Sequence, residues 1–107
     1  MSVYIVQEVK GRNVLSAQKF GELKLMLPPG DIVLSAQPTI KRLKVKLKDF
    51  TDDDYILTMG DPIAIALAGA IACEYNNGKV KFLKWDRQER QYYPVKCNLR
   101  GESNDWW

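Results

Sequence analysis

The apolar positions between residues 55 and 85 predict a strand, a helix and a second strand. Residues 55–59 and 80–85 are short apolar runs, and residues 63–75 between them leave almost no polar face. A helix of this kind must be covered on most sides, and it is too short to span a bilayer. Because it returns the chain to the same end of the sheet, the three elements predict a right-handed parallel βαβ unit.

The residues at both ends of this helix support the prediction. Asp61 can cap the first turn of the helix by accepting a hydrogen bond from a backbone N–H. Pro62 lacks a backbone N–H, and at the first helical position that group would have no partner within the helix. At the other end, Asn77 and Gly78 can adopt the positive φ that ends many helices.

Three other segments are expected to extend the sheet or to cross it. Residues 3–9 and 22–27 alternate side chains between two faces and are expected as hairpin-like strands, with a short helical turn in residues 14–20 between them. Residues 91–99 are expected as a last antiparallel strand at an edge, because Pro94 lacks the amide that a central strand would use.

Residues 39–50 fit two patterns. Ile40, Leu43 and Leu47 form a stripe at helical spacing, but the same segment also alternates apolar residues with lysines, as a strand does. We favour the helix, because Pro38 suits a first helical turn and because the βαβ unit needs a helix to cover the other face of its sheet.

Together these elements predict an α/β protein. We expect a single compact domain over residues 1–100, with a mixed sheet of about five strands, a central parallel βαβ unit and two main helices. Residues 101–107 are expected as a tail whose Trp106 and Trp107 dock on this chain or on a neighbouring one. The tail and the apolar helix both favour a homo-oligomer.

The composition excludes more chemistry than it suggests. The chain has 107 residues and a net charge of +3, which is too small to indicate duplex nucleic acid. It has no histidine, the usual general base, and Cys73 and Cys97 form no CxxC or zinc pattern. We therefore assign no catalytic residue, metal or cofactor and expect a binding protein rather than an enzyme. The N-terminus shows no signal peptide, so a cytoplasmic protein is expected.

Candidate ligand contacts follow the two strands of the βαβ unit. Gly60 and Asp61 precede a helix N-terminus, whose free amides favour an anion. Trp85, Arg87 and Arg90 follow the second strand, and these residue types dominate binding hot spots. Two simpler explanations stay open: Asp61 can itself occupy the helix amides, and the charged residues after Trp85 can form an exposed turn.

A cationic cluster marks a second candidate surface. Its members are Lys41, Arg42, Lys44, Lys46 and Lys48. Lys41, Lys44 and Lys48, together with Trp106 and Trp107, are candidate contacts to a partner protein. The alternative is a solvated helix face, because Asp49 and the acidic residues 52–54 follow at once and are expected in a solvated turn.

Two resemblances add to this reading. The segments FTDDDYIL (residues 50–57), GDP (60–62), YNNGKV (75–80) and LKWDRQER (83–90) resemble a small, largely uncharacterised family encoded by tailed bacteriophages. This resemblance implies a protein of the infected cell's cytoplasm that acts in host takeover, in counter-defence or in phage replication. More weakly, the layout from Gly60 to Asp86 is similar to small CRISPR-associated ring nucleases (CARF-like), which bind cyclic oligoadenylates across a symmetric oligomer. The histidines of that family have no counterpart here, which implies binding without cleavage.

Three functional hypotheses result. The first is a non-catalytic phage protein that sequesters a nucleotide or a cyclic oligonucleotide signal. The second is a protein inhibitor or modulator of a host enzyme. The third and least favoured is a metal-dependent nuclease that uses Asp61 and Asp86.

Overall fold

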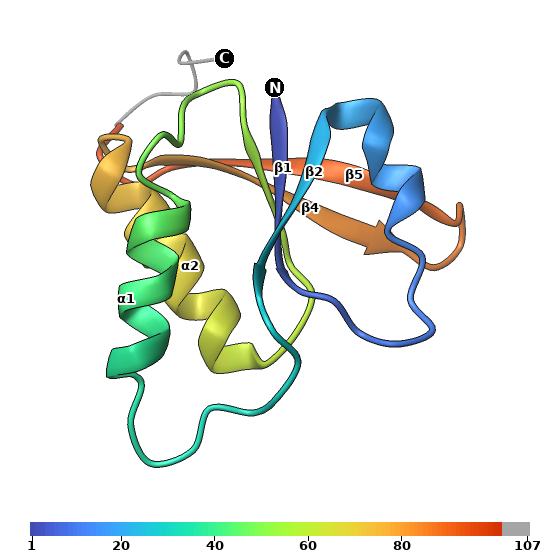
Figure 1. Cartoon of the computed structure of the whole chain (residues 1–107). Helices are drawn as coiled ribbons and strands as arrows, with labels where there is room; N and C mark the ends of the chain where they lie inside the picture. The colour runs from blue at the N-terminus through green and yellow to red at the C-terminus, as the bar shows by residue number, and fades with distance from the viewer. Residues whose placement is uncertain (102–107) are drawn as a thin grey trace.

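Within residues 1–101, which the computed structural model describes, five strands form one sheet in the order β2-β1-β3-β4-β5 (Figure 1). The elements are β1 (Ser2–Gln7), the 3-10 helix η1 (Leu15–Phe20), β2 (Glu22–Leu27), α1 (Gln37–Lys46), β3 (Tyr55–Leu57), α2 (Pro62–Tyr75), β4 (Lys79–Asp86) and β5 (Gln91–Asn98). The four strands β1 to β4 are parallel, and β5 runs antiparallel to β4. The predicted mixed sheet with two main helices is confirmed.

The parallel βαβ unit consists of β3, α2 and β4, as predicted. Ile56 of β3 pairs with Phe82 of β4. Asp61 caps α2, because its Oδ1 accepts the backbone N–H of Ile63 at 2.7 Å. After the last turn, Gly78 has a φ of 82°. The local signals at both helix ends therefore operate in the folded protein.

The expected hairpin of the first two strands is wrong. β1 and β2 run parallel, with Val3 opposite Leu23, and residues 8–21 carry the chain back across the sheet through η1. Alternation of side chains predicts that a segment is a strand but not its direction. A loop long enough to cross the sheet allows the parallel pairing, which a tight turn does not.

Both α-helices pack on one face of the sheet, and η1 lies on the other face (Figure 1). Residues 37–46 are indeed helical, but the expectation that this helix covers the face opposite α2 is wrong. A right-handed crossover selects its face by the direction in which it moves along the sheet. The crossovers through α1 and α2 move in the same direction, whereas the crossover through η1 moves in the opposite one.

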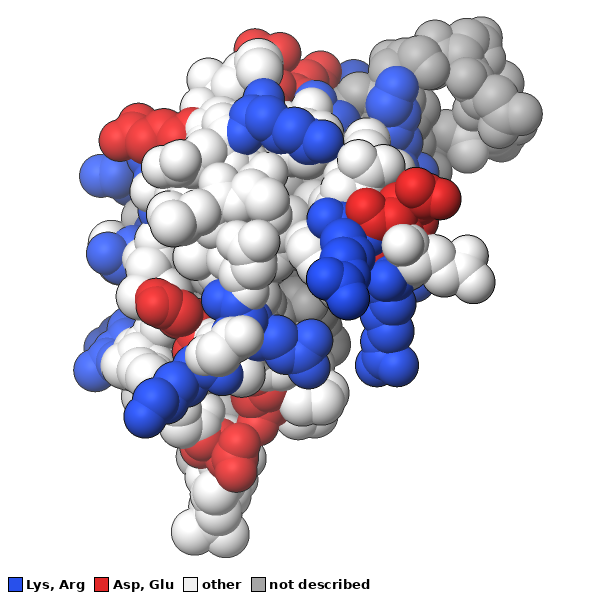
Figure 2. Space-filling view, turned by 90° about the vertical axis from the view of Figure 1, so that its right-hand side faces the viewer, with Lys and Arg blue, Asp and Glu red and all other residues white. Residues whose placement is uncertain are grey.

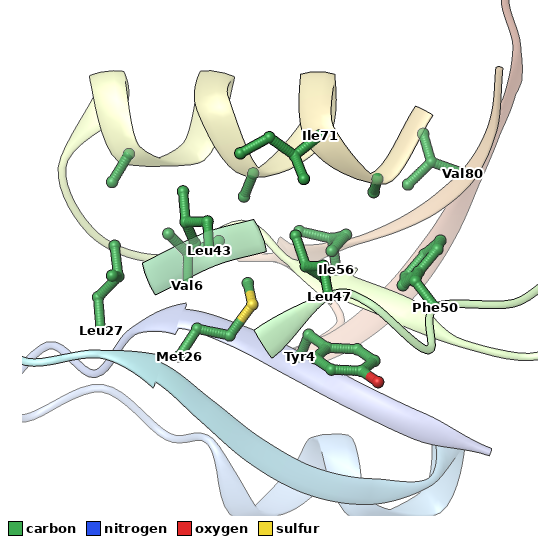
Figure 3. Packing of buried hydrophobic residues seen from close by; sticks show 13 residues of the cluster. Tyr4, Val6, Met26, Leu27, Leu43, Leu47, Phe50, Ile56, Ile71 and Val80 are labelled. Atoms are coloured by element: carbon green, nitrogen blue, oxygen red, sulfur yellow. The ribbon is translucent and has the colours of Figure 1, made fainter. Parts of the chain in front are cut away.

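The main core lies between the two α-helices and the sheet (Figure 3). Leu43 and Leu47 reach it from α1 and its C-terminal end, Ile71 from α2, and Val6 and Ile56 from the sheet. Leu43, Leu47, Val6 and Ile56 have no solvent exposure. Their burial holds the carboxyl ends of β1 and β3 in fixed positions, since both strands are central in the sheet.

The outward side of α2 is open in the part of the chain that the structure describes. Ile63 is 52% exposed, and Ala66 and Ala70 are also exposed. Residues 1–101 therefore cover one side of the helix and leave its outward side to solvent. No helix in this range is long and apolar enough to cross a membrane.

The acidic residues before β3 are only partly in a solvated turn. Asp52 and Asp53 are exposed, but Asp54 is buried. Its Oδ1 accepts the N–H of Ser2 at 2.9 Å, and its Oδ2 accepts the N–H of Thr51 at 2.9 Å. Asp54 therefore joins the start of β1 to the turn before β3.

Candidate ligand-binding cleft

A cleft opens where the chain leaves β1 and β3 in opposite directions. From β1 the chain crosses the η1 face to β2, and from β3 it crosses the α2 face to β4. In open parallel sheets, such a point leaves a crevice at the carboxyl ends of the strands. Here it has a volume of about 550 Å³ and is lined by Val9, Gly11, Arg12, Asn13, Leu57, Thr58, Met59, Gly60, Trp85 and Tyr92.

Two aromatic side chains form the wall on the β4–β5 side. Trp85 and Tyr92 are opposite each other in the sheet, with ring centroids 4.9 Å apart and an interplanar angle of 66°. The Tyr92 hydroxyl donates a 2.6 Å hydrogen bond to the carbonyl of Asn13 in the loop after β1. Burial raises the pKa of Tyr92, and the nearby Arg12 guanidinium opposes that shift. The half-buried Trp85 thus offers an aromatic surface on a wall tied to the opposite loop.

The cleft carries a cation but no carboxylate among its lining residues. Arg12 is exposed, and no ion pair joins it to another described residue. Figure 2, which faces the side with η1 and the β4–β5 turn, shows lysine and arginine side chains at several places, with a few carboxylates among them. This face of the protein suits an anionic ligand.

Gln7, the last residue of β1, joins the loop after β2 to the loop after β3. Its Nε2 donates hydrogen bonds to the carbonyls of Pro28 at 2.9 Å and Gly30 at 2.7 Å. Its Oε1 accepts the backbone N–H of Asp61 at 2.7 Å. Gly60 makes room for this arrangement, since a Cβ at Gly60 would lie 2.6 Å from the Cβ of Gln7. The loop after β3 is therefore positioned before any ligand binds.

Both carboxylate oxygens of Asp61 already accept hydrogen bonds from the protein backbone. One carboxylate oxygen caps α2, and the other accepts the N–H of Ile32 from the loop after β2 at 3.2 Å. The Asp61 carboxylate already accepts the first backbone N–H groups of α2, and its negative charge would repel a phosphate at this helix N-terminus. The capping explanation of Asp61 therefore agrees with the geometry, because the carboxylate already accepts the N–H groups of Ile63 and Ala64 that a phosphate would need.

The structure brings together two of the five predicted ligand contacts. Gly60 and Trp85 both line the cleft, whereas Asp61 does not. Arg87 and Arg90 lie in the exposed turn between β4 and β5, beyond the lining residues. These two arginines follow Trp85 in the sequence and add positive charge on the turn beyond the cleft.

Arg12 and Asn13 are cleft residues that the sequence did not predict. The tripeptide Gly11-Arg12-Asn13 reads as an ordinary turn when β1 and β2 are taken as a hairpin. Ligands bind beyond the carboxyl ends of parallel strands, which is why Gly60 after β3 was selected. Had β1 been known to be parallel as well, the same rule would have selected the residues that follow its carboxyl end, Arg12 and Asn13.

The two carboxylates of the nuclease hypothesis also serve the backbone. Asp86 Oδ1 accepts the N–H groups of Gln88 at 2.9 Å and Glu89 at 3.3 Å, which closes the β4–β5 turn. Within residues 1–101, no group of three or more acidic, Cys or His side chains could hold a metal ion.

The candidate partner surface is only partly described. Lys41 and Lys44 are exposed on α1, and Lys48 is exposed just after it. No ion pair joins these three lysines to another described residue. Trp106 and Trp107 lie outside the described residues.

The fold and the cleft define a small α/β protein with an open, mostly parallel sheet and a crevice at the carboxyl ends of its strands. Residues 1–99 match the family model described as Phage Pam3 gp32-like protein, so the chain belongs to this phage protein family. The expected phage family is thereby confirmed. No curated protein and no solved structure matches the chain.

Proposed function

We propose that this phage protein is a non-catalytic binding protein whose cleft takes a nucleotide. The observation that supports the proposal most is the combination, in one crevice of about 550 Å³, of the aromatic wall of Trp85 and Tyr92 with the cation of Arg12. A base can stack on an aromatic side chain, and a guanidinium pairs well with a phosphate. Binding pockets for small ligands have volumes of this order.

The chemistry of the lining favours binding over turnover. The chain has no histidine, and the cleft is lined by no carboxylate or lysine that could serve as a general base instead. Asp61 and Asp86 directly follow the cleft residues Gly60 and Trp85 in the sequence, but their carboxylates accept hydrogen bonds from backbone N–H groups. The ligand would then leave the cleft unchanged.

A cyclic oligonucleotide signal is the more specific form of the proposal. One of its nucleotides would occupy the cleft, and its further phosphates would extend toward Arg87 and Arg90 on the exposed turn. Removal of such a signal from the host cytoplasm would be a counter-defence activity. This form accounts for the arginines that lie beyond the cleft.

A thermal-shift panel of mononucleotides, cyclic dinucleotides and cyclic oligoadenylates tests the proposal. A ligand at a hundred times its dissociation constant adds about 2.7 kcal/mol, which raises the melting temperature of a domain of this size by several degrees. Arg12→Ala should remove the shift for every ligand that binds. The matched control Arg100→Ala, also exposed but outside the cleft, should keep it.

The double variant Arg87→Ala/Arg90→Ala separates the two forms of the proposal. It should weaken a cyclic oligonucleotide strongly and a mononucleotide little. Equal loss for both ligands would place the arginines in the cleft itself. A folded protein that shifts with no member of the panel would refute nucleotide binding.

The second candidate function is a modulator of a host enzyme that docks on α1. It is favoured by the exposure of Lys44 and Lys48 without an ion pair to another described residue. A host enzyme whose activity changes with the wild-type protein but not with Lys44→Glu/Lys48→Glu would support it, whereas equal effects of both proteins would remove these lysines from the interface.

A further inference from the structure

The sheet has two edges, and only one of them is blunted within residues 1–101. At the β5 edge, Pro94 is opposite Leu83, whose carbonyl accepts the N–H of Thr58, the residue after β3, at 3.2 Å. Leu83 therefore directs its backbone groups away from β5, and its partner Pro94 directs its own backbone away from β4, toward the open edge of the sheet. Another residue at this position would present an N–H group at that edge, but proline has none. A proline at this position keeps further strands from adding.

The β2 edge has no such protection. Glu22 donates its N–H to the carbonyl of Met1 at 3.1 Å, on the side of β1. Because successive residues of a strand direct their backbone groups to opposite sides, Leu23 and Leu25 direct theirs to the open edge. Six residues from Glu22 to Leu27 contain neither a proline nor a glycine. An extended segment of another protein can pair with this strand.

A cationic hollow lies beside this edge, between β2 and α1. Its volume is about 490 Å³, and it is lined by Met26, Lys41, Arg42, Val45 and Lys46. Val45 is 66% exposed, so the hollow offers apolar surface to solvent. No ion pair joins its three cations to another described residue. The hollow thus combines an apolar floor with positive charges around it.

We propose that the β2 edge binds an acidic, extended segment of a partner protein by strand addition. Main-chain hydrogen bonds to Leu23 and Leu25 would supply affinity, and the hollow would supply specificity. One apolar side chain of the segment would contact Met26 and Val45, and its carboxylates would pair with Arg42 and Lys46. The proposal does not depend on the ligand of the cleft, which lies at the carboxyl ends of the strands.

A second copy of this chain fits the edge poorly. Two β2 strands side by side would bring the cations of both hollows together, and with them Lys24 of each copy, which lies outside the hollow but shares a strand face with Met26. Carboxylates on the partner instead complement these charges. The charge of the hollow therefore selects an acidic partner over self-association.

The probe is a seven-residue peptide with blocked ends that alternates valine with glutamate. Isothermal titration calorimetry should detect its binding to the full-length protein. A peptide with lysine in place of glutamate, and one with a central proline, should bind at least about tenfold more weakly. On binding, the backbone amides of Leu23 and Leu25 should gain protection from hydrogen exchange.

Charge-reversed variants locate the site. Arg42→Glu/Lys46→Glu should weaken the acidic peptide by at least about tenfold. Lys44→Glu is the matched control, since Lys44 is also exposed on α1 but does not line the hollow, and it should retain most of the affinity. Circular dichroism checks that all three proteins are equally folded.

Four results would overturn the proposal. One is the absence of binding to the folded wild-type protein at millimolar peptide. Another is equal affinity for the glutamate and lysine peptides. The third is protection that appears at other strands while Leu23 and Leu25 stay unchanged. The fourth is dimerisation of the protein through β2.

Discussion

Replacing Gln7 by methionine should destabilise the protein far more than its position at a strand end suggests. Methionine is unbranched and similar in size, so it preserves the space beside Gly60 while removing the three side-chain hydrogen bonds to Pro28, Gly30 and Asp61. Each such bond contributes a net stabilisation of about 0.5–1.5 kcal/mol. Pro28 and Gly30 are exposed, so water replaces part of the loss at their carbonyls.

We therefore expect the free energy of unfolding to fall by about 2–3 kcal/mol, which lowers the melting temperature by about 10–20 °C. Urea denaturation followed by far-ultraviolet circular dichroism measures the change. The amides of Ile32 and Asp61 should also exchange faster with solvent, since both belong to the loops that Gln7 joins.

Gln18→Met is the matched control. Gln18 is exposed on η1, and its side chain makes no hydrogen bond to the described residues. Its replacement should change the stability by less than about 0.5 kcal/mol. If the Gln7 and Gln18 variants were equally stable, Gln7 would not hold the loops together, and the preformed shape of the cleft would need another explanation.

Three further outcomes test other parts of the structure. Asp54→Ala should cost about 2–3 kcal/mol in urea denaturation, because it leaves the amides of Ser2 and Thr51 without an acceptor, while exposed Asp53→Ala should cost less than about 0.5 kcal/mol; similar losses would contradict the role of Asp54. Stability should decrease as the pH rises above about 9, because burial raises the pKa of Tyr4, Cys73 and Tyr92 and the folded protein keeps protons that the unfolded chain releases; a urea midpoint that stays constant up to pH about 10.5 would argue against this. Sedimentation should show a monomer for Ala70→Glu if the predicted homo-oligomer forms through the open side of α2, which adjoins an apolar groove with Phe82 and Val95; an unchanged oligomer would place the interface elsewhere.

The chain's local signals were sufficient for several of the elements themselves. Asp61 and Pro62 start α2 because a side-chain acceptor and a missing donor suit a helix N-terminus wherever the helix lies. Pro94 assigned β5 to an edge for a similar reason, since a missing amide excludes a central position. Such signals depend on neighbours in the sequence, and they survive folding unchanged.

Strand direction and helix side depended on the tertiary structure. The alternation of Leu23 and Leu25 is the same in a parallel and an antiparallel strand, so it left the pairing with β1 undecided. The face chosen by α1 followed from the strand order, which no local pattern contains. An error in one strand direction was enough to hide Arg12 and Asn13 as cleft residues.

The sequence by itself thus indicated the type and the approximate place of most helices and strands, although the helix expected over residues 39–50 spans Gln37–Lys46 and the strand expected over residues 3–9 ends at Gln7. Only the tertiary structure decided that Gln7 and Asp61 join the end of β1 to the loops after β2 and β3, that Asp54 is buried, and that Trp85 and Arg12 line one crevice. The physical reason is range: capping and turn preferences act over a few residues, whereas these contacts join residues far apart in the sequence, from Gln7 with Pro28, which are 21 positions apart, to Gln7 with Asp61, which are 54 apart. Contacts of that range exist only once the strand order is set.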